Sequence, residues 1–369
     1  HRYTLSNPAK EIIANINVPI FIDVFLEGDL PSEFRRLQTE TKQLLEEFEA
    51  YNPNIKFKFL NPSEEKGDIE TLFKFGAKPA QIETKQNGKT SIQQVFPWAI
   101  ASFNNNYIKI PLLKNQLGVN TEERINNSVQ NLEYAFADAF NRLIEPKKRK
   151  IAVLKGNGEL EDKYIADFFA TLRNYYYIAP FTLDSVAKNP KTTLSQIKQF
   201  DLLVIASPTE QFTEEEKYIL DQYSMSGGAS LWLIDAIELV NDSVSGNNFA
   251  FGKDLNLTDF FFKYGIRINP NLIKDLYSAP ILLATGNERD SQYNKYPWLY
   301  SPLSNNSSSH PIVTNIEAVK FDYASSIDTL PNSIKKTILL SSSQVSKIVG
   351  MPKEIDITKE INKNLTIVN

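Results

Sequence analysis

The stretch from Gln199 to Ile234 reads QFDLLVIASPTEQFTEEEKYILDQYSMSGGASLWLI and contains two apolar segments separated by a helical pattern. The segments QFDLLVIA and SLWLI are short and almost continuously apolar, which is typical of strands buried on both faces. Thr213 begins a Thr-x-x-Glu capping box that ends at Glu216, and Gly227-Gly228 ends the helix. A strand, a helix and a strand at this spacing predict a parallel α/β sheet.

The residues before this stretch extend the same pattern. Ile151–Leu154 is a predicted strand, a tight turn follows at 155–159, and a helix is expected over Asp162–Arg173. A further strand is expected over Tyr175–Phe181. Strands that alternate with helices favour a doubly wound, flavodoxin-like parallel sheet.

The first half of the chain predicts another mixed α/β domain. Val18–Leu26 is an apolar strand, a helix begins at Pro31, and Ile55–Leu60 is a half-exposed strand. Ile92–Phe103 and Tyr107–Leu112 are expected to form paired strands. This strand–helix–strand unit followed by a strand pair resembles a thioredoxin-like layout, although the Cys-x-x-Cys motif that redox members need is absent.

A long helix and a charged linker mark the predicted domain boundary. Apolar residues after Asn120 recur at steps of three and four, which predicts a helix that ends before Pro146. The basic run Lys147–Lys150 follows and is most simply a solvated linker. We therefore predict a thioredoxin-like domain over residues 1–148, a parallel-sheet domain over 149–340 and a C-terminal extension over 341–369.

Composition excludes several classes of function. The 369 residues include no Cys and two His, which excludes thiolate nucleophiles and Cys-ligated metals and leaves few general bases. The formal net charge is −4, whereas nucleic-acid-binding proteins usually present a basic field. We therefore expect no cofactor, no metal, no nucleic-acid partner and no enzymatic activity.

The start of the chain indicates a piece of a longer protein. It begins at His1-Arg2-Tyr3 with no initiator Met and no signal peptide. No segment approaches the roughly 18 apolar residues of a membrane helix. We expect a soluble fragment whose parent carries membrane segments outside it. The absence of Cys fits either a reducing compartment or a cell envelope.

Four residues mark a candidate cleft at the strand ends of the second domain. Gly156 and Glu159 lie in a turn after one strand, and Ser207 and Asp235 follow two others. Ligands of open α/β sheets usually bind at this carboxyl edge. The turn at 156–159 could cradle an anion with its N–H groups, or it is a plain tight turn whose acidic neighbours would repel phosphate.

Catalytic and metal-binding interpretations of this edge are weaker. Ser207 lacks the G-x-S-x-G elbow of a hydrolase, and its base would have to be His310 in a Ser/Asn-rich loop. Asp201, Asp235 and Glu214–Glu216 offer oxygens for a hard cation. However, no EF-hand spacing appears, and acids at a helix start are explained by the helix dipole.

An aromatic cluster is the best interaction candidate in the sequence. Tyr296, Trp298 and Tyr300 lie in a loop that also contains proline. Aromatic faces on a loop can stack on sugars or anchor a partner protein. The same side chains could instead anchor the loop against the sheet.

Several segments in order along the chain carry a family resemblance. They are Arg2–Ser6 with Ala9–Ile13, Leu30–Leu37, Ser226–Asp235, Tyr296–Leu303, His310–Ile316 and Phe321–Asp328 (FDYASSID). Together they resemble the periplasmic region of the GldG-type auxiliary proteins of ABC transporters, which are linked to gliding motility in Bacteroidetes. The resemblance covers nearly the whole chain.

This resemblance implies a thioredoxin-like domain without redox cysteines, followed by a domain similar to class I glutamine amidotransferases. In those enzymes a Cys nucleophile follows the strand that corresponds to Ser230–Ile234, whereas Asp235 follows it here. The family is regarded as non-enzymatic, so the resemblance passes on no catalytic residue. It also implies membrane helices before and after this region, and a complex with an ABC permease and an ATPase at the periplasmic face of the inner membrane.

We therefore expect a non-enzymatic periplasmic scaffold that binds partner proteins or cargo, with the permease, the ATPase and other envelope proteins as partners. A receptor for a small ligand such as a glycan, near Gly156, Ser207 and Asp235, is the alternative. A hydrolase that uses Ser207 or carboxylates is a third hypothesis. An exposed apolar patch at residues 296–300 would favour the scaffold, and a deep polar pocket would favour the receptor.

Overall fold

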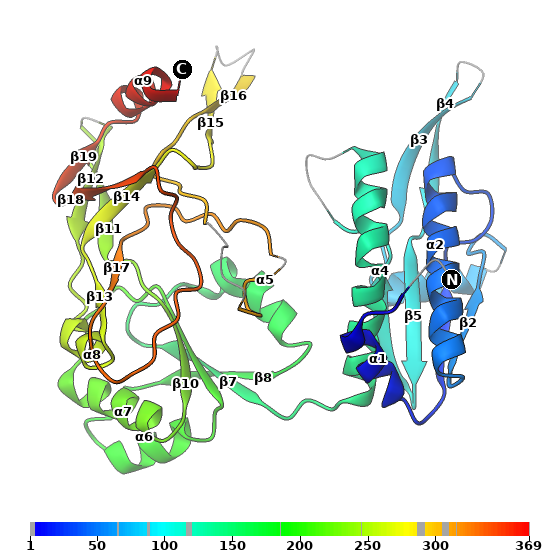
Figure 1. The fold of residues 1–369 in the computed structure, drawn as a ribbon, viewed down its shortest axis with the longest axis horizontal. Coiled ribbons are helices and arrows are strands. Elements are labelled where there is room, and N and C mark those ends of the chain that lie inside the picture. The colour runs from blue at the N-terminus through cyan, green and yellow to red at the C-terminus, as the bar shows by residue number, and fades with distance from the viewer. Residues whose placement is uncertain are drawn as a thin grey trace. The chain divides into compact units, whose positions relative to one another are not determined.

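A computed structural model describes residues 4–64, 66–86, 89–115, 120–184, 186–244, 246–285, 292–304, 310–314 and 316–368. The chain divides into two compact units, His1–Lys147 and Lys148–Asn369 (Figure 1). Each unit has its own apolar core, and the chain contains both parallel and antiparallel sheets. None of the helices in the described ranges is both long and apolar enough to cross a membrane.

The first unit is built on one four-stranded sheet. In chain order its elements are α1 (Asn7–Ala14), β1 (Ile20–Val24), α2 (Ser32–Tyr51), β2 (Ile55–Phe59), α3 (Lys66–Lys74), β3 (Ala80–Gln86), β4 (Lys89–Val95), β5 (Trp98–Phe103), β6 (Asn106–Pro111) and α4 (Thr121–Ile144). The sheet order is β2-β1-β5-β6. β1 is parallel to β2 and antiparallel to β5, which pairs antiparallel with β6.

The long helices α2 and α4 supply a large part of the core of the first unit. The sequence offers Asn120 or Thr121 as the cap of α4, and the N-cap is Asn120, whose side chain accepts a hydrogen bond from the Glu123 N–H at 2.8 Å. The rings of Phe136 and Phe140 on α4 meet Phe48 on α2 edge to face, with centroids 6.3 and 5.6 Å apart. The two helical stripes therefore interlock over the buried face of the sheet.

One predicted strand of the first unit is divided in two. The sequence pattern predicted a strand over Ile92–Phe103, but β4 ends at Val95 and β5 begins at Trp98. Pro97 lies at the break and has no N–H group to donate to a strand ladder. β4 pairs instead with β3, a strand that the sequence pattern did not reveal.

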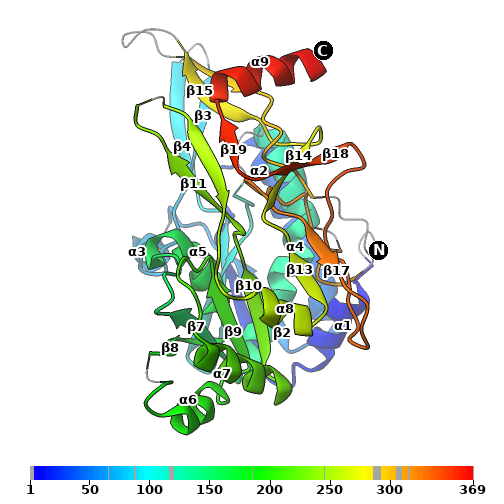
Figure 2. The same cartoon turned by 90° about the vertical axis from the view of Figure 1, so that its left-hand side faces the viewer.

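The second unit combines a parallel sheet with several antiparallel strand pairs (Figure 2). Its elements are β7 (Lys150–Lys155), α5 (Asp162–Leu172), β8 (Tyr177–Thr182), α6 (Pro190–Ile197), β9 (Leu202–Ala206), α7 (Glu214–Met225), β10 (Ala229–Leu233), β11 (Ile237–Asn241), β12 (Asn248–Gly252), α8 (Thr258–Lys263), β13 (Ile266–Ile268), β14 (Asn271–Asp275), β15 (Ile281–Thr285), β16 (Gln292–Tyr296), β17 (Ile327–Thr329), β18 (Ser346–Gly350), β19 (Lys353–Ile355) and α9 (Ile357–Val368). Strands β7 to β10 lie in the order β10-β9-β7-β8 and are all parallel, which confirms the predicted parallel α/β sheet.

Helices cover both faces of this parallel sheet. On one face, Phe169 of α5 packs with Val153 of β7. On the other face, Leu154 of β7 packs with side chains of α6, α7 and α8, among them Ile219. This distribution follows from right-handed crossovers, because the chain moves in one direction from β7 to β8 and then back across the sheet to β9 and β10.

Two glycines shape the turn between α7 and β10. Gly227 has φ +92°, a left-handed conformation that favours glycine. A Cβ at Gly228 would lie 2.4 Å from the ring of Tyr223, so no side chain fits there. The Tyr223 hydroxyl lies 3.1 Å from the carbonyl oxygens of Phe200 and Ala229, and burial raises the pKa of Tyr223 to about 12. The Gly-Gly pair therefore leaves room for the Tyr223 ring to pack beside the start of β10.

Apart from β13, whose Ile266 and Ile268 pack against the core of the parallel sheet, and its partner β17, the antiparallel strands of the second unit surround a separate core. Together, the antiparallel strands form the sheets β11-β12-β19, β13-β17, β14-β18 and β15-β16. Ile237, Ala250 and Leu272 from earlier strands meet Ile355 of β19 and Ile361 of α9 in this core. The last strands and the last helix therefore close a core that much earlier strands begin.

A buried ion pair holds α9 on β14. Lys274 is 4% exposed and Glu360 is 7% exposed, and their charged groups form a hydrogen-bonded salt bridge. The Lys274 ammonium also lies 4.7 Å from the centroid of the Tyr300 ring. Burial lowers the pKa of Lys274, and the Glu360 carboxylate opposes that effect.

Replacing Lys274 with Met is expected to destabilise the protein by about 3–5 kcal/mol, because Glu360 would stay buried without its partner. Lys274→Met combined with Glu360→Leu is expected to cost less than the single substitution. Urea unfolding followed by circular dichroism measures both losses. Lys359→Met is the matched control on the same helix, because Lys359 is 78% exposed, and it should change stability little. A double variant as unstable as Lys274→Met would contradict this account.

Candidate functional site

The predicted cleft residues all lie along the carboxyl edge of the parallel sheet. Gly156 and Glu159 follow β7, Ser207 follows β9, and Asp235 lies just after β10. The Ser207 hydroxyl donates a hydrogen bond to the Asp235 carboxylate. Ser207 has φ +50°, a left-handed conformation that is unusual for a residue with a side chain. The structure therefore brings Ser207 and Asp235 into direct contact.

The turn after β7 is bound tightly to the turn after β9. The Asn157 carbonyl accepts hydrogen bonds from the N–H groups of Thr209 and Glu210, both at 3.0 Å. The Thr209 hydroxyl donates to the Gly158 carbonyl at 3.0 Å. A Cβ at Gly158 would lie 2.0 Å from Thr209 Oγ1. The space between these two turns is therefore occupied by their own atoms.

The polar groups of the β7 turn bond to carboxylates of the chain itself. The Asn157 N–H donates to Glu159 Oε2 at 2.9 Å. The Asn157 side chain is buried and donates to Glu216 Oε2 at 3.1 Å. Burial raises the pKa of Glu159. A carboxylate of the turn thus takes a position that a bound anion would need, which favours the tight-turn interpretation over the anion cradle.

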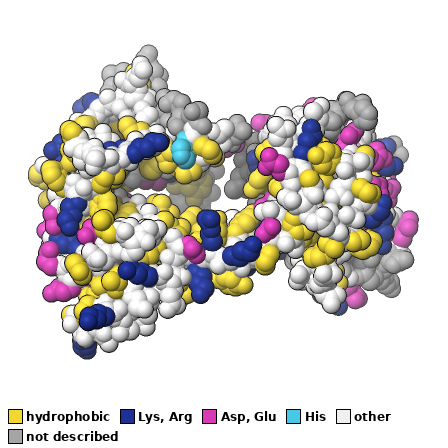
Figure 3. Space-filling model, turned by 60° about the horizontal axis from the view of Figure 1, so that its bottom comes forward, with side chains coloured by type: hydrophobic (Ala, Val, Ile, Leu, Met, Phe, Trp, Pro, Cys, Tyr) yellow, Lys and Arg dark blue, Asp and Glu magenta, His cyan; other side chains and the backbone are white. Residues whose placement is uncertain are grey.

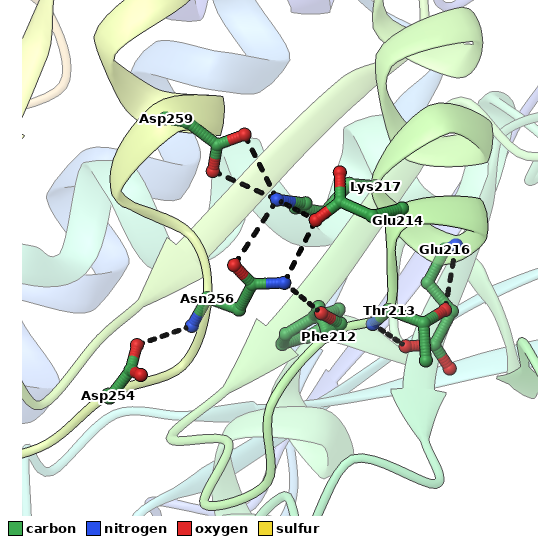
Figure 4. Close-up of polar contacts among 8 residues, drawn as sticks. All are labelled: Phe212, Thr213, Glu214, Glu216, Lys217, Asp254, Asn256 and Asp259. Atoms are coloured by element: carbon green, nitrogen blue, oxygen red, sulfur yellow. Dashed lines mark hydrogen bonds and ion pairs between the residues drawn. The ribbon is translucent and has the colours of Figure 1, made fainter.

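A buried lysine joins α7 to the segment that leads into α8 (Figure 4). Lys217 is 5% exposed, and its Nζ lies 2.7 Å from Glu214 Oε1 and 2.9 Å from Asp259 Oδ1. Asn256 donates from its side-chain amide to the Phe212 carbonyl at 2.8 Å and to Glu214 Oε1 at 3.1 Å. This lysine cluster therefore fastens the loop before α7 to the loop before α8.

The charges of the lysine cluster stabilise one another. The hydrogen bond from Lys217 lowers the pKa of Glu214 and of Asp259. Burial alone would lower the pKa of Lys217, but its bonds to the two carboxylates raise it above the ordinary value. All three groups are therefore held ionised near neutral pH, and none of them is poised to exchange a proton in a reaction.

The aromatic cluster lies in the core and not on an exposed loop. Trp298 is 3% exposed and Tyr300 is fully buried, and both belong to the core beside α9. Tyr300 stacks on Tyr323 with centroids 6.0 Å apart, and Tyr296 is half-buried. The prediction of a contact surface at Trp298 and Tyr300 is therefore wrong, because a buried ring offers no face to a partner. The anchoring interpretation fits instead.

The remaining predicted groups form local contacts. His310 Nδ1 accepts a hydrogen bond from the Ile312 N–H at 3.2 Å. Among the residues that the structure describes, no three His, Asp or Glu side chains gather closely enough to hold a metal ion. The Ser-rich residues 305–309 lie outside the described residues.

A cavity of about 520 Å³ lies between α5 and the strands β7 and β8. Val153, Phe169 and Ile178 contribute an apolar floor. Lys155 and Asp162 stand at its rim, with Lys155 Nζ 2.8 Å from Asp162 Oδ1. The sequence pattern did not reveal this cavity, because it arises where a helix stripe meets an edge strand and not at the strand-end turns.

The lysine cluster makes a prediction about pH. The carboxylates Glu214 and Asp259 have lowered pKa values, so their contribution to stability is present above the ordinary values of 4.5 and 3.8 and is lost as the pH falls through the folded values. Lys217 has a raised pKa, so its contribution is present below 10.5 and is lost as the pH rises through the folded value.

Lys217→Met should therefore lower stability at neutral pH and flatten both the acid and the alkaline loss. Urea midpoints across the pH range measure this profile. Glu215→Gln is the control, because that neighbouring acid is exposed at the same helix start. A Lys217→Met profile that runs parallel to the wild-type profile would exclude the cluster as the cause.

The contact between the two turns makes a second prediction. Gly158→Ala and Gly227→Ala both place a side chain at a positive φ, of +71° and +92°, which costs about 1–2 kcal/mol in each variant. Nothing lies within 4 Å of a Cβ at Gly227, whereas the Cβ at Gly158 collides with Thr209. We expect this overlap to add about 1–3 kcal/mol in Gly158→Ala. Equal unfolding free energies for the two variants would refute the close contact.

Two protein families match separate segments of the chain. Residues 1–102 match a domain of unknown function, and residues 148–366 match the family described as an ABC-type uncharacterized transport system. An uncharacterized protein of Borreliella burgdorferi (strain ATCC 35210 / DSM 4680 / CIP 102532 / B31) is 21% identical over 355 residues. The aligned part covers 95% of this chain and 65% of that relative, so the chain spans just under two thirds of the relative's length.

One solved structure shows a weak similarity. The mmIFT52 N-terminal domain aligns with 55% of this chain and 77% of its own, with a TM-score of 0.37 and 16% identity. A similarity at that level supports no conclusion about fold or function. The transport-system match, in contrast, covers more than half of the chain. This chain therefore belongs to the family of auxiliary components of an ABC-type transport system.

Proposed function

We propose that this chain is the periplasmic, non-enzymatic scaffold region of a GldG-type ABC-transporter auxiliary subunit linked to gliding motility. In this role it binds the permease, the ATPase or other envelope proteins, and it is held at the inner membrane by segments outside the chain. The observation that carries the proposal is the match of residues 148–366 to an ABC-type transport system.

The chemistry of the sheet edge supports a role without catalysis. Asp235 occupies the position that the Cys nucleophile has in class I glutamine amidotransferases, if the resemblance to them holds. Its carboxylate accepts a hydrogen bond from Ser207. Acyl transfer needs a nucleophile beside a base. Ser207 bonds to the Asp235 carboxylate, and Lys217 is held protonated by Glu214 and Asp259. A carboxylate is a weak base for a serine hydroxyl, and a protonated lysine cannot accept a proton, so neither arrangement suits acyl transfer.

The strand arrangement supports the proposed kinship of both units. The order β2-β1-β5-β6, with β1 and β2 parallel and the other pairs antiparallel, suits a thioredoxin-like domain over residues 1–148. The parallel sheet β10-β9-β7-β8 suits an amidotransferase-like domain over residues 149–340. Enzymes with either of these folds use a reactive Cys, and this chain contains none. In the proposed role both domains therefore serve as binding modules.

A small-ligand receptor at the strand ends is the alternative proposal. It has less support, because the turns that carry Gly156 and Thr209 fill the space between them. The cavity beside α5 has an apolar floor, and neither Ser207 nor Asp235 is among the residues that line it. We therefore prefer a protein-binding scaffold to a glycan receptor.

The proposal predicts that the full-length protein, captured from native membranes, brings with it an ABC permease and an ATPase. Mass spectrometry of the captured material, compared with an unrelated membrane protein as bait, measures their enrichment. Recovery of neither subunit would overturn the transporter assignment for this chain.

Variants at the strand ends separate the scaffold from the alternatives. Ser207→Ala and Asp235→Asn should recover the same subunits and support the same transport phenotype as the wild type, because neither side chain acts in a reaction. A loss of the phenotype with capture unchanged would instead favour the hydrolase or the receptor.

A further inference from the structure

We propose that the amino edge of the parallel sheet in the second unit is a docking surface for an anionic lipid bilayer. This inference goes beyond the proposed binding of transporter subunits. It is argued from the charged and amphipathic side chains that the strand direction brings to this edge. It does not depend on which protein the chain binds.

Parallel strands bring separate basic residues to one edge. Lys150 begins β7, Arg173 is the C-cap of α5 before β8, and Lys198 is the C-cap of α6 before β9. Since β7, β8 and β9 point the same way, these three positions share the amino edge of the sheet. Lys148 and Arg149 come immediately before β7, so they extend the same basic surface.

Backbone contacts confirm that these positions are neighbours. The Arg149 carbonyl accepts a hydrogen bond from the Tyr177 N–H at 3.0 Å, at the start of β8. The Lys150 carbonyl accepts one from the Asp201 N–H at 2.9 Å, just before β9. The Lys150 N–H in turn donates to Asp201 Oδ2 at 2.7 Å. Asp201 is therefore an acid that lies within this edge, and its carboxylate is already bonded to the backbone.

The basic surface is exposed. Lys148, Arg149, Lys150, Arg173 and Lys198 all have exposed side chains. Figure 3 shows Lys and Arg side chains near the segment through which the chain enters the second unit. We name this group of five residues the amino-edge basic patch.

The opposite edge of the same sheet is acidic. Glu159, Asp184, Glu210 and Asp235 follow β7, β8, β9 and β10. Helix dipoles explain acids near helix starts and also favour cations at helix ends, such as Arg173. They do not explain Lys148–Lys150, which precede a strand. The second unit is thus polarised, and an anionic surface would be attracted to the amino edge and repelled from the other.

Amphipathic side chains at the basic edge favour a bilayer over other polyanions. Tyr177, at the start of β8, is 56% exposed, and Met225, at the end of α7 before β10, is 73% exposed. Tyrosines sit readily at the level of lipid head groups, and an exposed Met adds an apolar side chain that can enter the interface. Basic residues near an anionic membrane surface each strengthen binding.

Vesicle sedimentation with the full chain tests this proposal. The wild type should bind vesicles that contain phosphatidylglycerol and should not bind vesicles of phosphatidylcholine alone. Added salt should release the bound protein. Lys148→Gln, Arg149→Gln and Lys150→Gln together should weaken binding roughly 100-fold. Tyr177→Ala with Met225→Ser should weaken it further without changing the salt dependence.

A matched triple variant controls for net charge. Lys188→Gln, Lys295→Gln and Lys335→Gln remove three exposed cations away from the amino-edge basic patch and should keep most of the binding. Unchanged urea midpoints would show that the variants fold. Equal losses in the two triple variants, or no wild-type binding to anionic vesicles, would overturn the proposal. Binding to polyglutamate but not to vesicles would overturn it in favour of an acidic protein partner.

Discussion

All four strands of the sheet β10-β9-β7-β8 point in one direction, and much of the chemistry of the second unit depends on this constraint. Helices that follow such strands begin at the carboxyl edge, where their dipoles favour acids such as Asp162 and Glu214. The same helices end at the amino edge, where cations are favoured. The parallel arrangement therefore contributes to the separation of charge across the unit, while the net charge of the whole chain stays small.

The carboxyl edge is the place where an α/β protein usually meets its ligand, but here it is cross-linked by its own polar groups. Asn157 joins the β7 turn to the β9 turn, and Glu216 links Asn157 to the cap of α7. Lys217 then joins α7 to the start of α8. A chain of bonds of this kind gives a rigid edge. Rigidity suits a surface that must keep its shape within an assembly more than a site that must open for a substrate.

Periodicity and capping signals were sufficient to predict the parallel strands, the capping box at Thr213 and the long helix after Asn120. They could not predict contacts that depend on tertiary structure. Lys217 meets Asp259 because α7 and α8 pack on the same face of the sheet, and neither residue marks the other in the sequence. The sequence left open whether Trp298 and Tyr300 contact a partner or anchor their loop, because aromatic residues near proline suit both roles. Both side chains are buried in a core to which distant segments contribute, among them Leu272 of β14 and Ile361 of α9.

The pairing of β19 with β12 and of β18 with β14 has a consequence for the order in which the protein can fold during synthesis. Strands β11, β12 and β14 leave the ribosome well before Ile355 and Ile361, which complete their core. Until then, Ile237 and Leu272 have no covering layer, and the buried Lys274 has no counter-ion. The parallel sheet can form while the chain is still growing. The antiparallel part cannot complete its core until β19 and α9 have been synthesised. During that time its apolar strands are exposed and are the segments most in need of protection by chaperones.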